Sequence, residues 1–454
     1  MEALKSYWTI HASWKRVFII LISFFVILNA ILVFACSKIS DSVKENLRVS
    51  AYQLQKEGNY PNFINFYPTN YTQLDNYTEA SFLNFIYSNY DDPLKTAFLQ
   101  RELTPSMEPR GVERFVASIE EYSTSKDFLR PSYILGGRTL IILLLHRLNY
   151  VQIRKLIFLI GICMLIVSTF FVAKKLGIRW ATTYTLAFLC LQTLIAFNSI
   201  TMGVFTFLIT FISIIILIIE FNKVNAFYFM LVIGMFTAYF EWFSLSLISL
   251  GMITSVFLIL DTQSANCTNF RQSFNLMFNC VIAWIIGVCF MYLGRIVCSL
   301  LVGGDTVINH FMKRLTINMG ITNVNDVQNT PMYVNMIRSL VLSVGGIFPM
   351  NYLAAYWKYS PILAFILLLV SFIYVLKKIH EEYKRHHQNT VGVCICLMLV
   401  AITPLLWILI FNKFYEMHFW LAYRVLIITV FDLMSCLTII KTHNTLAANI
   451  EKEN

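Results

Sequence analysis

The sequence has little charge for its length. Asp, Glu, Lys and Arg make up only 13% of its 454 residues, whereas soluble domains carry about 25%. Hydrophobic residues instead make up 57% of the chain. This composition excludes an ordinary soluble protein. It predicts an all-α polytopic membrane protein, because a helix satisfies its own backbone hydrogen bonds in lipid.

The sequence also lacks motifs for disulfides and for cysteine-based metal sites. Its ten cysteines include no CxxC pair, and most lie within apolar runs. We find no internal repeat and no low-complexity segment. The net charge of +10 comes mostly from short basic clusters between apolar runs. Such clusters are typical of orientation signals in a membrane, so no nucleic-acid partner is predicted.

About ten apolar runs are long enough to cross about 30 Å of hydrocarbon. They are residues 17–36, 155–173, 180–197, 202–220, 225–240, 243–260, 274–300, 360–376, 392–411 and 419–440. A further run, 339–352, contains Gly345, Gly346 and Pro349 and is predicted to be re-entrant. The basic clusters then share one side, which predicts a multi-pass cell-membrane protein with both termini in the cytoplasm.

The spans divide the chain into a cytoplasmic start with the first span, an extracellular loop, a transmembrane bundle and a cytoplasmic tail, at 1–36, 37–154, 155–441 and 442–454. The part of the loop from 37 to 135 carries 13 of the 25 acidic residues. Residues 136–150 predict an interfacial helix with its cations at the headgroups. A second outer loop is predicted at 302–336.

Two acids in the extracellular loop, Asp75 and Glu79, precede an apolar-rich run. The pattern predicts a helix that starts near Thr72, and residues four apart share one face of a helix. Two such carboxylates could supply a general base with an orienting partner, or hold a divalent metal ion. Alternatively, both only favour the positive N-terminal end of the helix.

A third acid, Glu241, lies at the tip of the hairpin between 225–240 and 243–260. An acid there is costly unless it meets water, a cation or a polar partner. It is therefore either part of a site or a hydrated turn residue.

Cations lie near the outer ends of several spans. His418 is predicted at the outer mouth of the last span, and Arg424 one to two turns deeper. Together they suit an anionic group such as a lipid phosphate. The alternative is that Arg424 extends to the headgroups as a snorkelling side chain. Arg295, near the outer end of its own span, is a similar candidate, and Arg138 is one of the cations of the interfacial helix.

The order of these segments resembles a family of Gram-positive bacterial membrane proteins that look like GT-C-type glycosyltransferases. The similarity runs from about residue 70 to 425 and rests on four short motifs: Leu74–Glu79, Arg130-Pro131 through Arg154, Tyr239–Trp242, and Asn412–His418 with Arg424. The family more often has Asp where this chain has Glu79 and Glu241.

The resemblance implies a GT-C-like fold with juxtamembrane helices and a transfer reaction on the outer face. A sugar would move from a polyprenyl-phosphate donor in the membrane lipid to a cell-surface glycan. Asp75 would be the general base, supported by Glu79 and Glu241. The substrate-binding cations would be Arg424, His418, Arg295 and Arg138. No metal ligand is assigned, although a divalent metal cofactor and a small membrane partner protein both stay open.

Two other functions are compatible with the sequence. A transporter or flippase of lipid-linked sugar would keep polar groups near the bilayer midplane and would often show internal repeats. Here the spans are almost free of charge apart from Asp432 and Arg424. A polymerase or ligase of surface polysaccharide would share the large outer loop and the basic outer residues.

Overall fold

A computed structural model describes residues 13–63, 69–104, 110–121, 126–129, 136–221, 224–241, 245–263, 270–304, 306–318, 331–385 and 387–453. Six helical segments in these ranges are long and apolar enough to cross a membrane. They are α2 (Trp14–Cys36), α8 (Tyr150–Leu176), α14 (Phe270–Gly303), α18 (Ser360–Lys384), α19 (Gln388–Ile410) and the segment Phe419–Asn444. The chain is therefore a helical, multi-pass membrane protein, as its composition predicts.

The last of these segments is not one uniform helix. It consists of α21 (Phe419–Ala422), the 3₁₀ turn η3 (Tyr423–Leu426) and the start of α22 (Ile427–Glu453). The 3₁₀ turn contains Arg424. The predicted last span is thus interrupted at the residue that the sequence singles out.

Four of the ten predicted spans correspond to shorter helices. These are α9 (Ile178–Cys190), α11 (Val204–Glu220), α12 (Ala226–Phe240) and α13 (Leu247–Gln263), with 13, 17, 15 and 17 residues. At about 1.5 Å per residue they measure about 20–26 Å. The other helices after residue 155 are α10 (Thr193–Ala196), α15 (Thr306–Asn318), α16 (Met332–Val344), α17 (Met350–Leu353) and α20 (Asn412–Met417).

Glycine allows α12 and α14 to pack closely together. A Cβ added at Gly234 would lie 2.3 Å from the carbonyl oxygen of Trp284, and one at Gly287 would lie 2.2 Å from that of Leu231. Any side chain at either position would force the helices apart. Small residues at such contacts are typical of helix packing in membranes.

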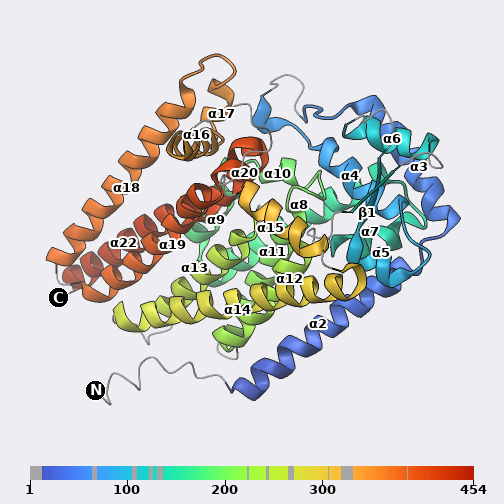
Figure 1. Cartoon of the computed structure of the whole chain (residues 1–454). Coiled ribbons are helices and arrows are strands. Elements are labelled where there is room, and N and C mark those ends of the chain that lie inside the picture. The colour runs from blue at the N-terminus through green and yellow to red at the C-terminus, as the bar shows by residue number, and fades with distance from the viewer. Residues whose placement is uncertain are drawn as a thin grey trace.

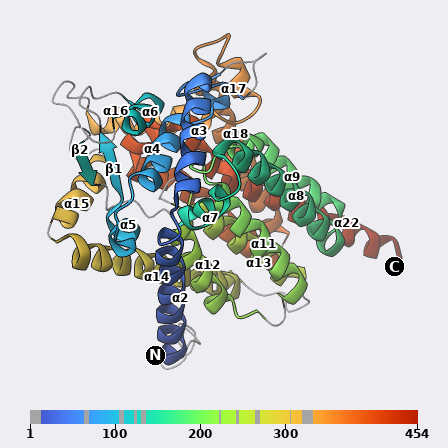
Figure 2. The same cartoon turned by 90° about the vertical axis from the view of Figure 1, so that its right-hand side faces the viewer.

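The predicted extracellular loop folds into small elements at one end of the bundle (Figure 1). They are α3 (Asp41–Glu57), η1 (Asn70–Thr72), α4 (Asn76–Tyr87), α5 (Pro93–Leu99), α6 (Val112–Glu120), α7 (Gly137–Leu145) and the antiparallel pair β1 (Arg101–Thr104) and β2 (Lys126–Leu129). The first turn of α2 and the end of α22 lie away from α3, α4 and α6 (Figures 1 and 2).

The segment predicted as an interfacial helix forms α7, but the position of its Arg138 side chain differs from the prediction. Leu140 and Leu143 are exposed, whereas Arg138 is fully buried inside the protein. Arg138 therefore does not reach out to headgroups. The predicted re-entrant segment 339–352 comprises the end of α16, a turn at Gly345 and Gly346, and the start of α17.

Candidate functional site

Asp75 is the N-cap of α4. Its Oδ1 accepts a hydrogen bond from the Thr78 amide at 3.0 Å, and its Oδ2 accepts one from the Thr78 hydroxyl at 2.7 Å. The helix therefore starts after Asp75 and not near Thr72 as predicted. Thr72 is already engaged, because its hydroxyl donates to the Thr69 carbonyl at 2.9 Å. The carboxylate of Asp75 stabilises the first turn of α4.

Glu79, one turn further along α4, is only 2% exposed. Its Oε1 accepts hydrogen bonds from the Thr201 amide and hydroxyl, each at 3.0 Å, and from the Ser199 hydroxyl. No described residue donates to its Oε2. Asp75 and Glu79 thus have separate partners although they are four residues apart.

Burial raises the pKa of Glu79 from 4.5 to about 7, in spite of the lowering effect of these hydrogen bonds and of the Arg154 charge. A carboxyl with one free oxygen and a pKa near neutrality has the properties of a general base.

Arg154 joins the start of α8 to α3 and α4 of the predicted extracellular loop. Its Nη2 donates to Glu57 Oε1 at 2.6 Å, and its Nη1 donates to Asn76 Oδ1 at 3.3 Å. Asn76 Nδ2 in turn donates to Glu57 Oε2 at 3.0 Å. This network fixes the N-terminal end of α4, and with it Asp75 and Glu79, to the bundle.

Glu241 caps the end of α12, and its side chain is buried. Its Oε2 accepts a hydrogen bond from the Thr206 hydroxyl at 3.2 Å. Glu79 and Glu241 therefore contact the two ends of one short segment, 199–206. Burial, followed by the charge of Glu241, raises the pKa of Tyr415 in α20.

Arg424 is fully buried, which excludes snorkelling to the headgroups. Its Nη1 donates to the carbonyls of Trp420 and Leu421 at 3.1 and 3.2 Å. No described residue accepts a hydrogen bond from its Nε or Nη2. A buried guanidinium with two free donors is suited to bind an anion.

His418 lies just before α21, half-buried between two aromatic rings. Its ring centroid lies 4.9 Å from that of Phe414 and 5.4 Å from that of Trp420. That His418 and Arg424 bind the same anion stays a prediction.

Aromatic contacts dock the predicted extracellular loop onto this segment. The Tyr60 ring stacks on Tyr77 of α4 at 6.0 Å and meets Trp420 edge-on at 5.8 Å. The Tyr71 ring contacts Phe419 and Tyr423 at 5.3 and 5.5 Å. Burial, and then the charge of Asp75, raise the pKa of Tyr60 to about 12. The acids of α4 and the arginine turn are therefore held at the same end of the bundle.

Arg138 and Arg295 converge elsewhere, on the carbonyl of Ala97 at the end of α5. Arg138 Nη2 donates to this carbonyl at 2.9 Å and Nη1 donates to the Thr96 carbonyl at 3.2 Å. Arg295 Nη2 also donates to Ala97, and its guanidinium lies 4.6 Å from the centroid of the Phe98 ring. Both side chains are buried. Arginine–carbonyl contacts at a helix C-terminus serve structure directly.

An apolar groove lies beside the arginine turn. It has a volume of about 450 Å³ and is lined by the 347–350 turn, by α18 and by α22 from Val430 to Leu437. A Cβ added at Gly346, next to the groove, would lie 2.4 Å from the Tyr423 ring. This glycine lets the 345–349 turn approach the residue that precedes Arg424.

Sequence reasoning missed the partners of the acids. Ser199 and Thr201 lie in the break between the apolar runs 180–197 and 202–220, where a polar turn is a usable signal, whereas Thr206 lies within the second run. Arg154 stands in the sequence as the last residue of the second motif, and its position alone does not indicate its partners. Of the motif residues, Arg130, Pro131 and Trp242 lie outside the described residues. Among the residues the structure describes, the only group of three or more potential metal ligands includes neither Asp75 nor Glu79.

Comparisons of the chain with protein-family models, with curated proteins and with solved structures give no match.

Proposed function

We propose that this protein is a membrane glycosyltransferase that moves a sugar from a polyprenyl-phosphate donor to a cell-surface glycan on the outer face. The observation that carries the proposal is the docking of the extracellular loop onto the 418–424 segment through Tyr60 and Tyr71. It holds a carboxyl with a pKa near 7 and a buried, incompletely bonded arginine at one end of the bundle. A transferase of this class needs both groups.

The reaction uses these groups in defined roles. The acceptor hydroxyl oxygen attacks the anomeric carbon of the donor sugar, and the bond from that carbon to the phosphate oxygen breaks. The hydroxyl proton passes to a carboxylate, and the electron pair leaves with the polyprenyl phosphate. Fixed positive charge stabilises the leaving phosphate. Arg424 supplies this charge in the proposal, with His418 beside it.

The carboxylate that takes the proton is Glu79 in this proposal. Its Oε2 has no described partner, whereas both oxygens of Asp75 are used to cap α4. Asp75 then acts as a positioning residue, as does Glu241 through Thr206. Because Glu79 is enclosed, the 199–201 turn must move when the acceptor binds.

The donor lipid is assigned to the groove of about 450 Å³ beside the arginine turn. Its walls are almost entirely apolar, which suits a polyprenyl chain. In this arrangement the lipid phosphate lies toward Arg424, and the membrane itself delivers the donor.

The remaining topology is part of the same proposal. The four shorter helices α9, α11, α12 and α13 complete ten spans, with residues 37–135 outside the cell membrane and both termini in the cytoplasm. This orientation follows the basic clusters of the sequence. The donor lipid and the acceptor glycan are the proposed partners.

A reconstituted assay tests the proposal directly. The purified full-length chain in liposomes receives polyprenyl phosphate that carries a radiolabelled sugar, together with a surface-glycan acceptor. We expect label in the glycan and stoichiometric release of polyprenyl phosphate. Movement of the intact lipid across the bilayer without release would instead identify a flippase. Joining of lipid-linked glycan units would identify a polymerase.

A further inference from the structure

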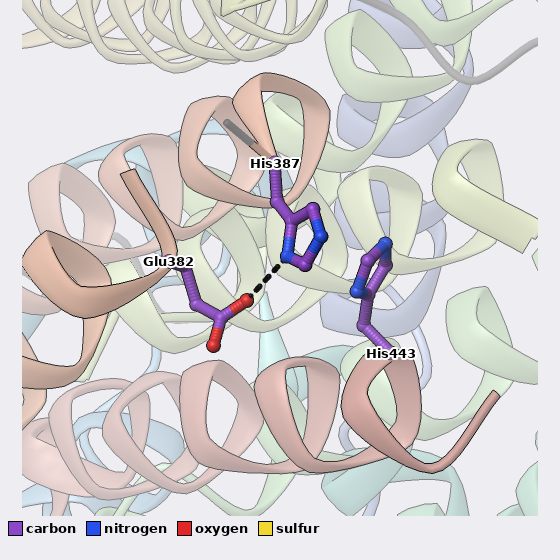
Figure 3. Close-up of side chains that lie close together, drawn as sticks. All are labelled: Glu382, His387 and His443. Atoms are coloured by element: carbon purple, nitrogen blue, oxygen red, sulfur yellow. Dashed lines mark hydrogen bonds and ion pairs between the residues drawn. The ribbon is translucent and has the colours of Figure 1, made fainter. Parts of the chain in front are cut away.

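Three potential metal ligands meet at the far end of the bundle from the extracellular loop. Glu382 lies in the last turn of α18, His387 precedes α19, and His443 lies in α22. Figure 3 shows the two imidazole rings side by side, with the Glu382 carboxylate next to His387. One potential ligand atom from each residue lies within 4.8 Å of the other two.

Neighbouring side chains orient the Glu382 carboxylate, which is 1% exposed. Its Oε1 accepts hydrogen bonds from Arg385 Nη1 at 2.9 Å and from Asn444 Nδ2 at 3.0 Å. Its Oε2 lies 2.8 Å from His387 Nδ1. One oxygen is thus fixed by outer contacts while the other faces the imidazoles. Metal-ligating carboxylates are usually held in this way.

His443 supplies an independent observation. Its ring centroid lies 4.2 Å from that of His387. Its Nδ1 is buried, and no described residue forms a hydrogen bond with it. A buried ring nitrogen without a partner is costly.

We propose that Glu382, His387 and His443 form a binding site for a divalent transition metal ion of the zinc type. Two imidazoles and one carboxylate are ligands that Zn²⁺ and Co²⁺ accept, whereas Mg²⁺ and Ca²⁺ prefer oxygen alone. Three protein ligands leave a fourth position for water.

The geometry is close to that of a bound ion. With metal–ligand bonds of about 2.1 Å, tetrahedral ligand atoms lie about 3.4 Å apart. The three ligand atoms lie within 4.8 Å of one another, so they must move closer together as the ion binds. The Arg385 side chain is 54% exposed and can turn away as the ion enters. A bound ion would join the end of α18 and the start of α19 to α22, the helix that follows the Arg424 turn.

Titration with Co²⁺ tests the site, because tetrahedral Co²⁺ has a strong visible spectrum. The full-length chain is purified in detergent and carries no polyhistidine tag. We expect one Co²⁺ per chain, displaced by Zn²⁺. His443→Ala and Glu382→Gln should each weaken binding by at least about tenfold. His380→Ala, which removes an exposed histidine of α18, is the matched control and should bind like the wild type.

Two results would overturn the proposal. One is a wild-type chain that shows no saturable Co²⁺ spectrum. The other is an equal affinity in His443→Ala and in His380→Ala. Far-ultraviolet circular dichroism checks that each variant is folded. If Glu382→Gln unfolds, His443→Ala decides alone, because removing its Nδ1 breaks no hydrogen bond to a described residue.

Discussion

Thr201 donates two hydrogen bonds to Glu79, from its amide and its hydroxyl, and both end on the same carboxylate oxygen at 3.0 Å. The other oxygen, Oε2, is buried and receives none from the part of the chain that the structure describes. Glu79 is therefore a half-satisfied carboxyl between α4 and the 199–201 turn. Its charge state should influence both stability and activity.

The pH dependence of stability follows from the pKa of Glu79, which burial raises from 4.5 to about 7. Between these values the folded chain binds a proton that the unfolded chain releases, so stability falls as pH rises and levels off above about 7. At about 1.4 kcal/mol per pKa unit the loss is about 3 kcal/mol. We expect the apparent unfolding temperature to fall over this range and Glu79→Gln to remove most of the fall. If the unfolding temperature of Glu79→Gln falls with pH as steeply as that of the wild type, Glu79 is not the group responsible.

The identity of the general base can be separated from the helix cap. Glu79→Gln should slow sugar transfer by at least about a hundredfold, because a positioned base contributes about 10²–10⁴ to the rate. Asp75→Asn should transfer at nearly the wild-type rate, because Asn is also a good N-cap. The measurement is initial transfer rate at saturating donor. The reverse pattern would place the base at Asp75, as the family resemblance implies.

Arg424 should be required for donor binding. Arg424→Ala should weaken the binding of polyprenyl-phosphate sugar at least about tenfold, because hydrogen bonds to charged groups contribute about 1.5–3 kcal/mol. Arg424→Lys should restore only part of the donor affinity that Arg424→Ala loses, since an ammonium cannot form two parallel hydrogen bonds to phosphate. Equilibrium binding in nanodiscs measures both, and the exposed Arg179→Ala is the control. Normal donor affinity in Arg424→Ala would show that the arginine has a structural role only.

Arg295 and Arg138 should behave differently from Arg424. Both bond to the Ala97 carbonyl, so Arg295→Met and Arg138→Met should each lower the unfolding temperature of the purified protein. Removing a buried donor from such a contact typically costs about 1–3 kcal/mol. Donor affinity should stay near the wild-type value. A selective loss of donor affinity without loss of stability would return both arginines to the substrate site.

The orientation in the membrane can be tested with two exposed lysines, Lys95 in α5 and Lys384 at the end of α18. A membrane-impermeant thiol reagent applied to intact cells should label Lys95→Cys and should label Lys384→Cys only after the cells are opened. The unmodified chain gives the background from its native cysteines. Labelling of Lys384→Cys in intact cells would reverse the topology.

Much of the architecture could be predicted from the sequence because it depends on local composition. The long apolar runs at 17–36, 155–173 and 274–300 give α2, α8 and α14, since twenty or so apolar residues in lipid have few alternatives to a helix. The break of the last span at Tyr423–Leu426 could not be predicted. It depends on contacts with Tyr71 and with the Gly346 turn, which are distant in the sequence.

The candidate site shows the same division. Asp75, Glu79, Glu241 and Arg424 were identifiable because charge is rare in this chain. The hydrogen-bond partners and neighbours of each residue could not be predicted from the sequence. Thr72 and Asp75 are both good N-caps, and Asp75 caps α4 because the Thr72 hydroxyl is already bonded to Thr69. Arg138 was expected at the headgroups, but the free carbonyls at the end of α5 bind it in the interior.

The short helices α11, α12 and α13 have a consequence for the surrounding lipid. Three consecutive helices of 17, 15 and 17 residues are about 23–26 Å long, which is less than the hydrocarbon thickness of a typical bilayer. In the proposed ten-span topology, the bilayer beside α11 and α12 must become thinner or admit water from one face, whereas α13 is buried inside the protein. The protein should therefore function best in membranes made of short-chain or unsaturated lipids. Longer acyl chains in the bulk lipid should inhibit it, although these lipids do not contact the candidate site.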